Sequence, residues 1–268
     1  MSIADFRLAF LLLVRSRLWL VTGIVAAVVA ACAWLAGQFS PRQPDTVALD
    51  VGISLIRIFV PLLGLLQIQD LLAKEVDRRL ILTSLTYPRA RATFLLGRYL
   101  AVVAAALIMT VVLLMVVAAV VVWAGQDYSQ VSKVAIGRPY LLTGSLIWLD
   151  AIVVIAFGAA LASISTTPHL VFLGGIGFMI IARSASTIIA LLEREHQLLS
   201  GGELYSQGLQ WVQWIIPDLA ALDVRPIALY GKMELLTASP WALVLMPLGY
   251  IALLLMLACL KFERRQFA

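Results

Sequence analysis

Charge is what this sequence lacks most. Only 13% of its 268 residues are Asp, Glu, Lys or Arg, whereas 62% are hydrophobic. A soluble globular domain is typically about 25% charged and about 45–50% apolar. The chain is long enough for one or two soluble domains, but no part of it stays polar for long. The composition therefore leaves no room for a separate catalytic domain and indicates an integral membrane protein.

Cysteine, histidine and nucleotide-binding motifs are also scarce. Cys32 and Cys259 fall inside apolar runs, which is typical of small buried hydrophobic residues. The sequence contains neither a GxxxxGK[ST] phosphate-binding loop nor an HExxH zinc motif. No nucleophile, base and orienting group stand in a recognisable pattern. We therefore expect a non-catalytic chain with no metal site and no bound cofactor of its own.

Six stretches have the length and apolar character of transmembrane helices, which need about 20 mostly apolar residues. They are Leu18–Gly37, Val51–Leu72, Leu100–Ala124, Tyr140–Ile164, Leu170–Leu192 and Trp241–Leu260. No repeat and no linker divides them. The sequence thus predicts an all-α membrane protein in which residues 1–268 form a single transmembrane domain.

The basic residues predict how these spans are oriented. If the N-terminus is inside, segments 1–17, 73–99 and 261–268 hold twelve of the twenty Lys and Arg residues, and segments 40–50, 125–139 and 193–240 hold six. Cytoplasmic flanks of membrane proteins carry this excess of positive charge. Both termini are therefore predicted to be cytoplasmic, and an even number of spans agrees with this because it places both termini on the same side.

Two segments outside the spans have an apolar character of their own. Residues 1–17 place Ile3, Phe6 and Phe10 at helical spacing beside Arg7, which is typical of an amphipathic helix lying on the membrane surface. The alternative is that they only extend the first span inward. In the external segment 193–240, the apolar run 209–216 is too short to span, and we interpret it as an interfacial or re-entrant helix that ends at Pro217.

The start of the chain also raises the question of a signal peptide. The run Val29–Cys32 loosely resembles a lipoprotein cleavage box. A signal sequence has an apolar core of only about 7–15 residues. Here the apolar run continues past Cys32, so we expect a retained first span.

Polar side chains inside the spans are candidates for a functional site. Arg57, Gln67, Asp150 and Arg183 fall within predicted spans. A charge in the hydrocarbon core is costly and usually faces the bundle interior or a water-filled path. Two interpretations stay open: the charges line a transport pathway, or Asp150 pairs with an arginine and holds the helices together.

The longest predicted cytoplasmic loop, 73–99, mixes charges of both signs. Its first part reads Lys74, Glu75, Val76, Asp77, Arg78 and Arg79, followed by an apolar stretch that includes Leu82 and then by Pro88 and Arg89. Positive-inside anchoring explains the basic residues but not Glu75 and Asp77. We predict a short helix over about Leu72–Leu85 on the membrane face, with charges that a soluble partner can bind.

Three parts of the chain together resemble the permease subunits of ABC-2 type ABC transporters. The first is Glu75 followed by Leu80, Leu82, Leu85, Pro88-Arg89 and Leu95–Arg98. The second is Ile215–Leu219 followed by Leu222-Asp223 and Leu229–Gly231, and the third is the ending Phe262–Phe267. The chain departs from the family in having Arg78 and Arg79 where Gly and Thr are usual, and in a displaced serine before Pro88.

The resemblance implies a function as the membrane-spanning subunit of an ATP-driven exporter in a bacterial inner membrane. Two permease copies, as a homo- or heterodimer, would form the pathway, and a separate ATPase subunit would bind ATP and Mg²⁺. Lys74–Arg79, Leu82, Pro88 and Arg89 would then contact that ATPase. The family also allows a periplasmic or envelope partner, and nothing points to nucleic acid. The alternatives are a secondary carrier driven by an ion gradient, with Asp150 as its ion site, and a non-transporting membrane assembly factor.

Overall fold

The computed structural model describes residues 3–40, 42–73, 91–125, 134, 136–165, 167–196, 216–231, 234 and 239–264. These residues form eight α-helices with a π-helix and a 3-10 helix between them, and none of the described residues lies in a β-strand. The predicted all-α fold class is confirmed.

Six of the described helices are long and apolar enough to cross a membrane. They are α2 (Leu18–Gln38), α3 (Pro44–Ile68, continued by the π-helix η1, Gln69–Ala73), α6 (Arg91–Ala124), α7 (Arg138–Ile164), α8 (Pro168–His196) and α11 (Pro240–Arg264). Each overlaps one predicted span. At about 1.5 Å per residue, the 34 residues of α6 extend about 51 Å, well beyond a hydrocarbon core of about 30 Å. The chain is a multi-pass membrane protein.

The second span begins earlier than the sequence predicts. Helix α3 starts at Pro44, whereas hydropathy places the start near Val51. Proline is favoured at the first position of a helix, where no N–H is needed, and an acid in the first turn is stabilised by the helix dipole. Asp45 is buried there, and its Oδ1 accepts a hydrogen bond from the Thr46 N–H at 2.6 Å. The polar residues 44–50, which hydropathy assigns to a loop, therefore form the start of α3.

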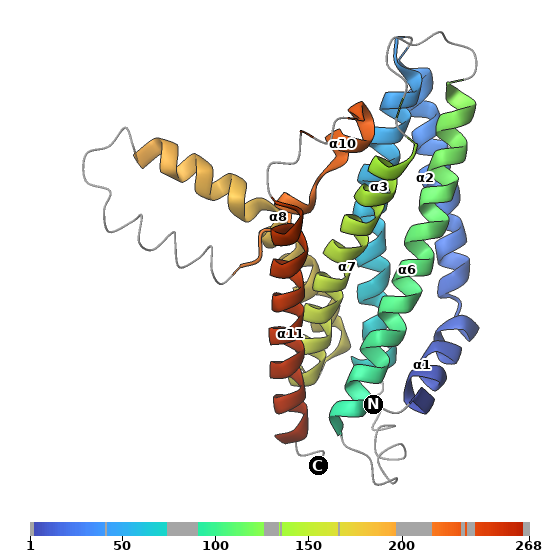
Figure 1. Cartoon of the computed structure of the whole chain (residues 1–268). Helices are drawn as coiled ribbons and strands as arrows, with labels where there is room; N and C mark the ends of the chain where they lie inside the picture. The colour runs from blue at the N-terminus through green and yellow to red at the C-terminus, as the bar shows by residue number, and fades with distance from the viewer. Residues whose placement is uncertain are drawn as a thin grey trace.

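Both ends of the chain lie at one end of the bundle (Figure 1). Helix α1 (Ile3–Arg15) lies at this end, at an angle to α2, and a turn at Ser16 and Arg17 separates the two helices. The first span therefore does not simply continue into α1, and the location of α1 on the membrane surface stays a prediction. The short helix α10 (Arg225–Tyr230) lies toward the other end. We call these the α1 end and the α10 end.

Helices α3 and α7 form the centre of the bundle. In the most apolar window of each span, 61% of α3 and 72% of α7 is buried, against 22% for α2 and 28% each for α8 and α11. Small residues let the central helices approach closely. Leu65 of α3 packs against Gly158 of α7 and Gly175 of α8, where an added Cβ would lie only 2.8 Å and 2.5 Å from its methyl carbons. The remaining spans expose their apolar faces, as lipid contact requires.

Candidate functional site

The three charged residues predicted inside the spans lie at the same level of the bundle. Counting along the helices toward the α1 end, Arg57 is 16 residues from Ala73, Asp150 is 14 from Ile164, and Arg183 is 15 from Pro168. At about 1.5 Å per residue these separations are about 24, 21 and 22 Å. Helical rise alone therefore brings three charges that are far apart in sequence to one depth.

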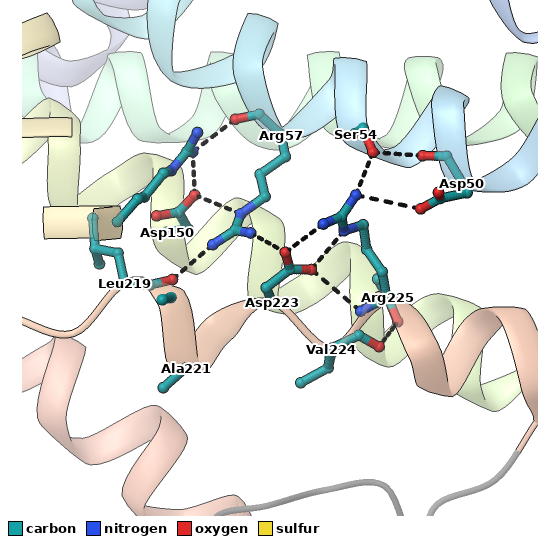
Figure 2. Close-up of polar contacts among 12 residues, drawn as sticks. Asp50, Ser54, Arg57, Asp150, Leu219, Ala221, Asp223, Val224 and Arg225 are labelled. Atoms are coloured by element: carbon teal, nitrogen blue, oxygen red, sulfur yellow. Dashed lines mark hydrogen bonds and ion pairs between the residues drawn. The ribbon is translucent and has the colours of Figure 1, made fainter. Parts of the chain in front are cut away.

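At this depth the two arginines converge on the carboxylate. Asp150 is completely buried, and its Oδ2 forms an ion pair with Nη2 of Arg183. Nε of Arg57 lies 3.6 Å from the same oxygen. Figure 2 shows Arg57 reaching from α3 toward Asp150 on α7. Asp150 therefore faces the protein interior and contacts two arginines, whereas the pairing interpretation drawn from the sequence gave it one.

Arg183 makes a second contact, with a backbone carbonyl that Pro61 leaves without its helical hydrogen-bond donor. Pro61 lies inside α3 and has no N–H, so the helix cannot supply the usual donor to the carbonyl of Arg57, four residues earlier. Nη2 of Arg183 donates a hydrogen bond to that carbonyl oxygen at 2.7 Å. In a membrane, a backbone group released by proline must find such a partner within the protein. Arg183 thus bridges the Asp150 carboxylate and the α3 backbone.

Arg57 extends the cluster to the segment 217–231, which carries α10. Its Nη1 forms an ion pair with Oδ2 of Asp223, and its Nη2 donates a hydrogen bond to the carbonyl oxygen of Leu219 at 2.7 Å. The N–H of Leu219 in turn donates to the carbonyl of Ala182 on α8 at 3.1 Å. The backbone of Leu219 is therefore held on both sides, by α3 and by α8.

Asp223 and Arg225 complete the cluster toward the α10 end. Arg225 makes two hydrogen bonds to the Asp223 carboxylate, Nε to Oδ1 at 2.7 Å and Nη2 to Oδ2 at 2.8 Å. Its Nη1 contacts Oδ1 of Asp50 at 3.3 Å and donates to the hydroxyl of Ser54, both on α3 (Figure 2). A bidentate pair between guanidinium and carboxylate is among the stronger polar contacts in proteins.

The electrostatics of this outer pair follow from these contacts. Burial alone would raise the pKa of Asp223, but hydrogen bonds from Arg225 and the charges of Arg57 and Arg225 outweigh it and hold the pKa below its ordinary value. The hydrogen bonds to Asp223 likewise raise the pKa of Arg225, more than burial lowers it. Both groups are therefore charged at neutral pH.

We call the six charged residues Asp50, Arg57, Asp150, Arg183, Asp223 and Arg225 the ionic network. Exposure of the side chain rises along it, from 1% at Asp150 and 11% at Arg57 to 20% at Asp223, 32% at Arg225 and 49% at Asp50. Three arginines balance three aspartates, so the network is neutral. A neutral, internally paired cluster is suited to joining elements and not to binding an ion. Among the described residues, no group of His, Cys, Asp and Glu could hold a metal ion.

Local structure explains why segment 217–231 presents Asp223 and Leu219 in this way. Oδ1 of Asp218 accepts hydrogen bonds from the N–H groups of Ala220 and Ala221, at 3.0 and 3.3 Å, and starts the 3-10 helix η2 (Ala220–Leu222). Helix α10 ends at Tyr230 and is capped by Gly231, whose φ of 67° is the left-handed conformation that glycine adopts without strain. The segment is thus shaped by capping residues at both ends.

Gln67 does not join the ionic network. It lies ten residues beyond Arg57 on α3, about 15 Å toward the α1 end. Its side chain is buried, and Nε2 lies 3.1 Å from Sδ of Met109, while Oε1 is buried without a hydrogen-bond partner. The structure therefore separates Gln67 from the three charged residues with which the sequence grouped it.

Two other predicted features lie outside the described residues. One is the set of ATPase-contact candidates, Lys74, Glu75, Val76, Asp77, Arg78, Arg79, Leu82, Pro88 and Arg89. The other is the apolar run 209–216, of which only Ile216 is described. The short helices that the structure does describe before the last span, η2 and α10, begin after Pro217.

Sequence reasoning missed Asp50, Ser54, Asp223 and Arg225 as parts of the site. It assigned them to exposed loops or left them without a role, because their hydropathy is ordinary for a membrane surface. A signal was present for Asp223. It belongs to the stretch from Ile215 to Asp223 that resembles ABC-2 permeases, and it is followed after one residue by an arginine. That spacing does not reveal which span receives the pair.

Comparison with known proteins supplies the family. The model of the ABC-2 family transporter protein matches residues 9–267, nearly the whole chain. A comparison with curated proteins gave no match. The matched range contains all six membrane-spanning helices and the entire ionic network. The chain therefore belongs to the ABC-2 family of transporter membrane proteins.

Proposed function

We propose that this chain is the non-catalytic permease subunit of an ATP-driven ABC-2 type exporter. The observation that carries the proposal is the family match over residues 9–267 on a chain with six apolar helices long enough to span a membrane. Such a subunit needs a separate ATPase that binds ATP and Mg²⁺, and a second permease copy to complete the pathway. The single transmembrane domain of residues 1–268 is the unit that would pair.

The proposed orientation places the α1 end in the cytoplasm of a bacterial cell and the α10 end outside the inner membrane. The excess of Lys and Arg in segments 1–17, 73–99 and 261–268 supports it. The part of segment 73–99 between η1 and α6 then lies in the cytoplasm, where Glu75 and Asp77 can meet the ATPase. On the other side, segment 217–231 packs against the outer parts of α3 and α7 and contacts α8 at Ala182.

In this proposal the ionic network couples the outer segment to the spans. Asp150 and Arg183 join α7 to α8, while Arg57 joins both to Leu219 and Asp223. A movement of α3 relative to α7 and α8 changes these contacts, and with them the position of segment 217–231. An ATP-driven movement of the spans would thereby be transmitted to the outer end of the pathway through the charged contacts inside the bundle.

The experiment that tests the function is reconstitution with an ABC ATPase encoded beside the gene. The full chain and the ATPase should co-purify, and ATP hydrolysis should rise when both are in proteoliposomes. Reversing two charges, Glu75→Lys with Asp77→Lys, should weaken association or substrate-stimulated hydrolysis while membrane insertion is unchanged. Glu203→Lys with Glu234→Lys is the matched control, because it reverses two acids in the segment predicted to face outward.

Two results would contradict the proposal. Transport that runs on a proton or sodium gradient without any ATPase would identify a secondary carrier instead. Association without transport of any candidate substrate, and without stimulation of ATP hydrolysis, would favour an assembly factor. If the Glu75 and Asp77 reversal leaves association and transport normal, those two acids are ordinary solvated charges.

A further inference from the structure

Helix α1 presents a face that no other described part of the chain covers. Its buried side carries Ala9 and Leu13, which pack into the core. The opposite side exposes four large apolar side chains, Leu8 at 57%, Leu11 at 47%, Leu12 at 44% and Val14 at 46%. Such a row of exposed apolar residues on a helix at the end of a bundle indicates contact with something other than bulk water.

Two arginines lie within the same exposed arc. At 3.6 residues per turn, Val14, Arg7, Leu11, Arg15, Leu8 and Leu12 follow one another across about 160° of the helix surface. Arg7 and Arg15 thus stand between apolar residues and not on a separate polar face. Both are exposed, as is Arg17 in the turn that follows. In the part of the chain that the structure describes, none of the three has an ion-pair partner.

No exposed acid of α1 accompanies these arginines. The acid of this helix, Asp5, is half-buried on the side that meets α6, where it lies against Gly97. The exposed face is therefore purely basic and apolar. Its complement must offer negative charge at the level of the guanidinium groups and hydrocarbon directly beside it. The headgroup region of an anionic phospholipid layer has this arrangement, because arginine stems lie along acyl chains while their heads reach the phosphates.

We propose that this face of α1, formed by Arg7, Leu8, Leu11, Leu12, Val14 and Arg15, is a binding surface for anionic phospholipids. The leucines enter the boundary between headgroups and acyl chains, and the arginines bind phosphate oxygens. A zwitterionic lipid offers the same phosphate next to a cationic group, so it is bound less tightly. Each arginine contributes about a fivefold preference for the anionic headgroup at low salt. The surface is separate from the ionic network and does not depend on the transport proposal.

The position of α1 gives this surface a structural consequence. Helix α1 packs on the first turns of α6, where a Cβ at Gly97 would lie 3.1 Å from Cβ of Asp5 and 3.4 Å from the backbone N of Phe6. Gly97 therefore permits a backbone contact that holds α1 against a membrane-spanning helix. Lipid bound to the exposed side of α1 is thus adjacent to the start of α6.

The test is a lipid titration of the purified full chain, followed by native mass spectrometry. Phosphatidylglycerol and phosphatidylcholine with identical acyl chains are the two probes. We expect the unaltered chain to prefer phosphatidylglycerol, and the double variant Arg7→Gln/Arg15→Gln to lose about tenfold or more of that preference. The preference should also fall as salt is raised, because screening weakens exposed charge contacts.

Three further measurements decide the interpretation. Arg7→Lys/Arg15→Lys keeps the charge and should keep most of the preference, which separates lipid binding from a folding defect. Arg42→Gln/Arg138→Gln removes two exposed arginines at the α10 end and should leave the preference unchanged. Equal lipid preference in the Arg7 and Arg15 variant and the unaltered chain would overturn the proposal. So would loss of ATPase association in that variant with lipid preference intact, since α1 would then be a protein-docking face.

Discussion

The side chain of Arg183 replaces a hydrogen-bond donor that α3 lacks. Its Nη2 donates to the carbonyl oxygen of Arg57, which Pro61 leaves without the usual helical N–H, and also pairs with Asp150. One guanidinium group therefore satisfies a backbone defect and a buried charge. This relationship explains why a costly arginine is stable inside a span, and it yields the first prediction.

Pro61→Ala should weaken the dependence of the fold on Arg183. Alanine restores the N–H that can bond to the Arg57 carbonyl, so the contact made by Arg183 becomes redundant. We expect Arg183→Lys to destabilise the Pro61→Ala variant by about 1 kcal/mol less than it destabilises the unaltered chain. Thermal unfolding of the four proteins in detergent measures this coupling. Strictly additive effects would show that Pro61 and Arg183 act independently.

Removal of the Asp150 charge should be among the most damaging single changes. Asp150→Leu leaves Arg57 and Arg183 buried without their shared carboxylate, which costs about 3–5 kcal/mol for a broken buried ion pair. Asp150→Asn retains one acceptor oxygen and should be milder. The double variant Asp150→Asn/Arg183→Gln removes one charge of each sign. It should therefore be more stable than the single variant Asp150→Asn. No recovery in unfolding measurements would mean that the pair is not the source of the stability.

The contact between segment 217–231 and the spans should resist mild acid. The pKa of Asp223 is held below its ordinary value of 3.8, so its ion pairs are intact above that pH and are lost only as pH falls through the lower, folded-state pKa. A nitroxide attached at Ala221→Cys should show unchanged mobility between pH 8 and pH 4, and greater mobility only once the pH falls below 3.8.

Asp223→Asn supplies the control for this measurement, because it removes the titrating group. The nitroxide in that variant should be mobile at every pH. A mobility transition near pH 6 in the unaltered background would assign the pH response to another group.

A covalent link between segment 217–231 and α8 should block transport if the outer segment moves. The N–H of Leu219 lies 3.1 Å from the carbonyl oxygen of Ala182, so the two backbones are close enough for a disulfide at Leu219→Cys/Ala182→Cys. In a chain whose native Cys32 and Cys259 are replaced by alanine, oxidation should abolish transport and a reductant should restore it. Each single cysteine variant is the control. Full transport in the cross-linked protein would show that the outer segment stays fixed during the cycle.

Much of the fold could be predicted from local sequence. Hydropathy located all six spans because lipid requires about 20 apolar residues wherever a helix crosses. It failed at Pro44–Asp50, since hydropathy scores polar residues as loop even where Pro44 and Asp45 favour the start of a helix. It also identified Arg57, Asp150 and Arg183 as unusual, because charge inside a span is rare for a simple energetic reason.

The sequence by itself determined that this chain is a membrane protein, how many times it can cross the membrane, and which charged side chains inside the spans require partners. Only the tertiary structure decided which partners they find. Asp150 could have paired with either arginine, and it contacts both because helical rise brings all three to one depth. Asp223 and Arg225 entered the site through contacts across 166 and 171 positions, from Arg57 to Asp223 and from Ser54 to Arg225. Such contacts depend on how helices pack against one another, which periodicity and hydropathy along a single helix do not encode.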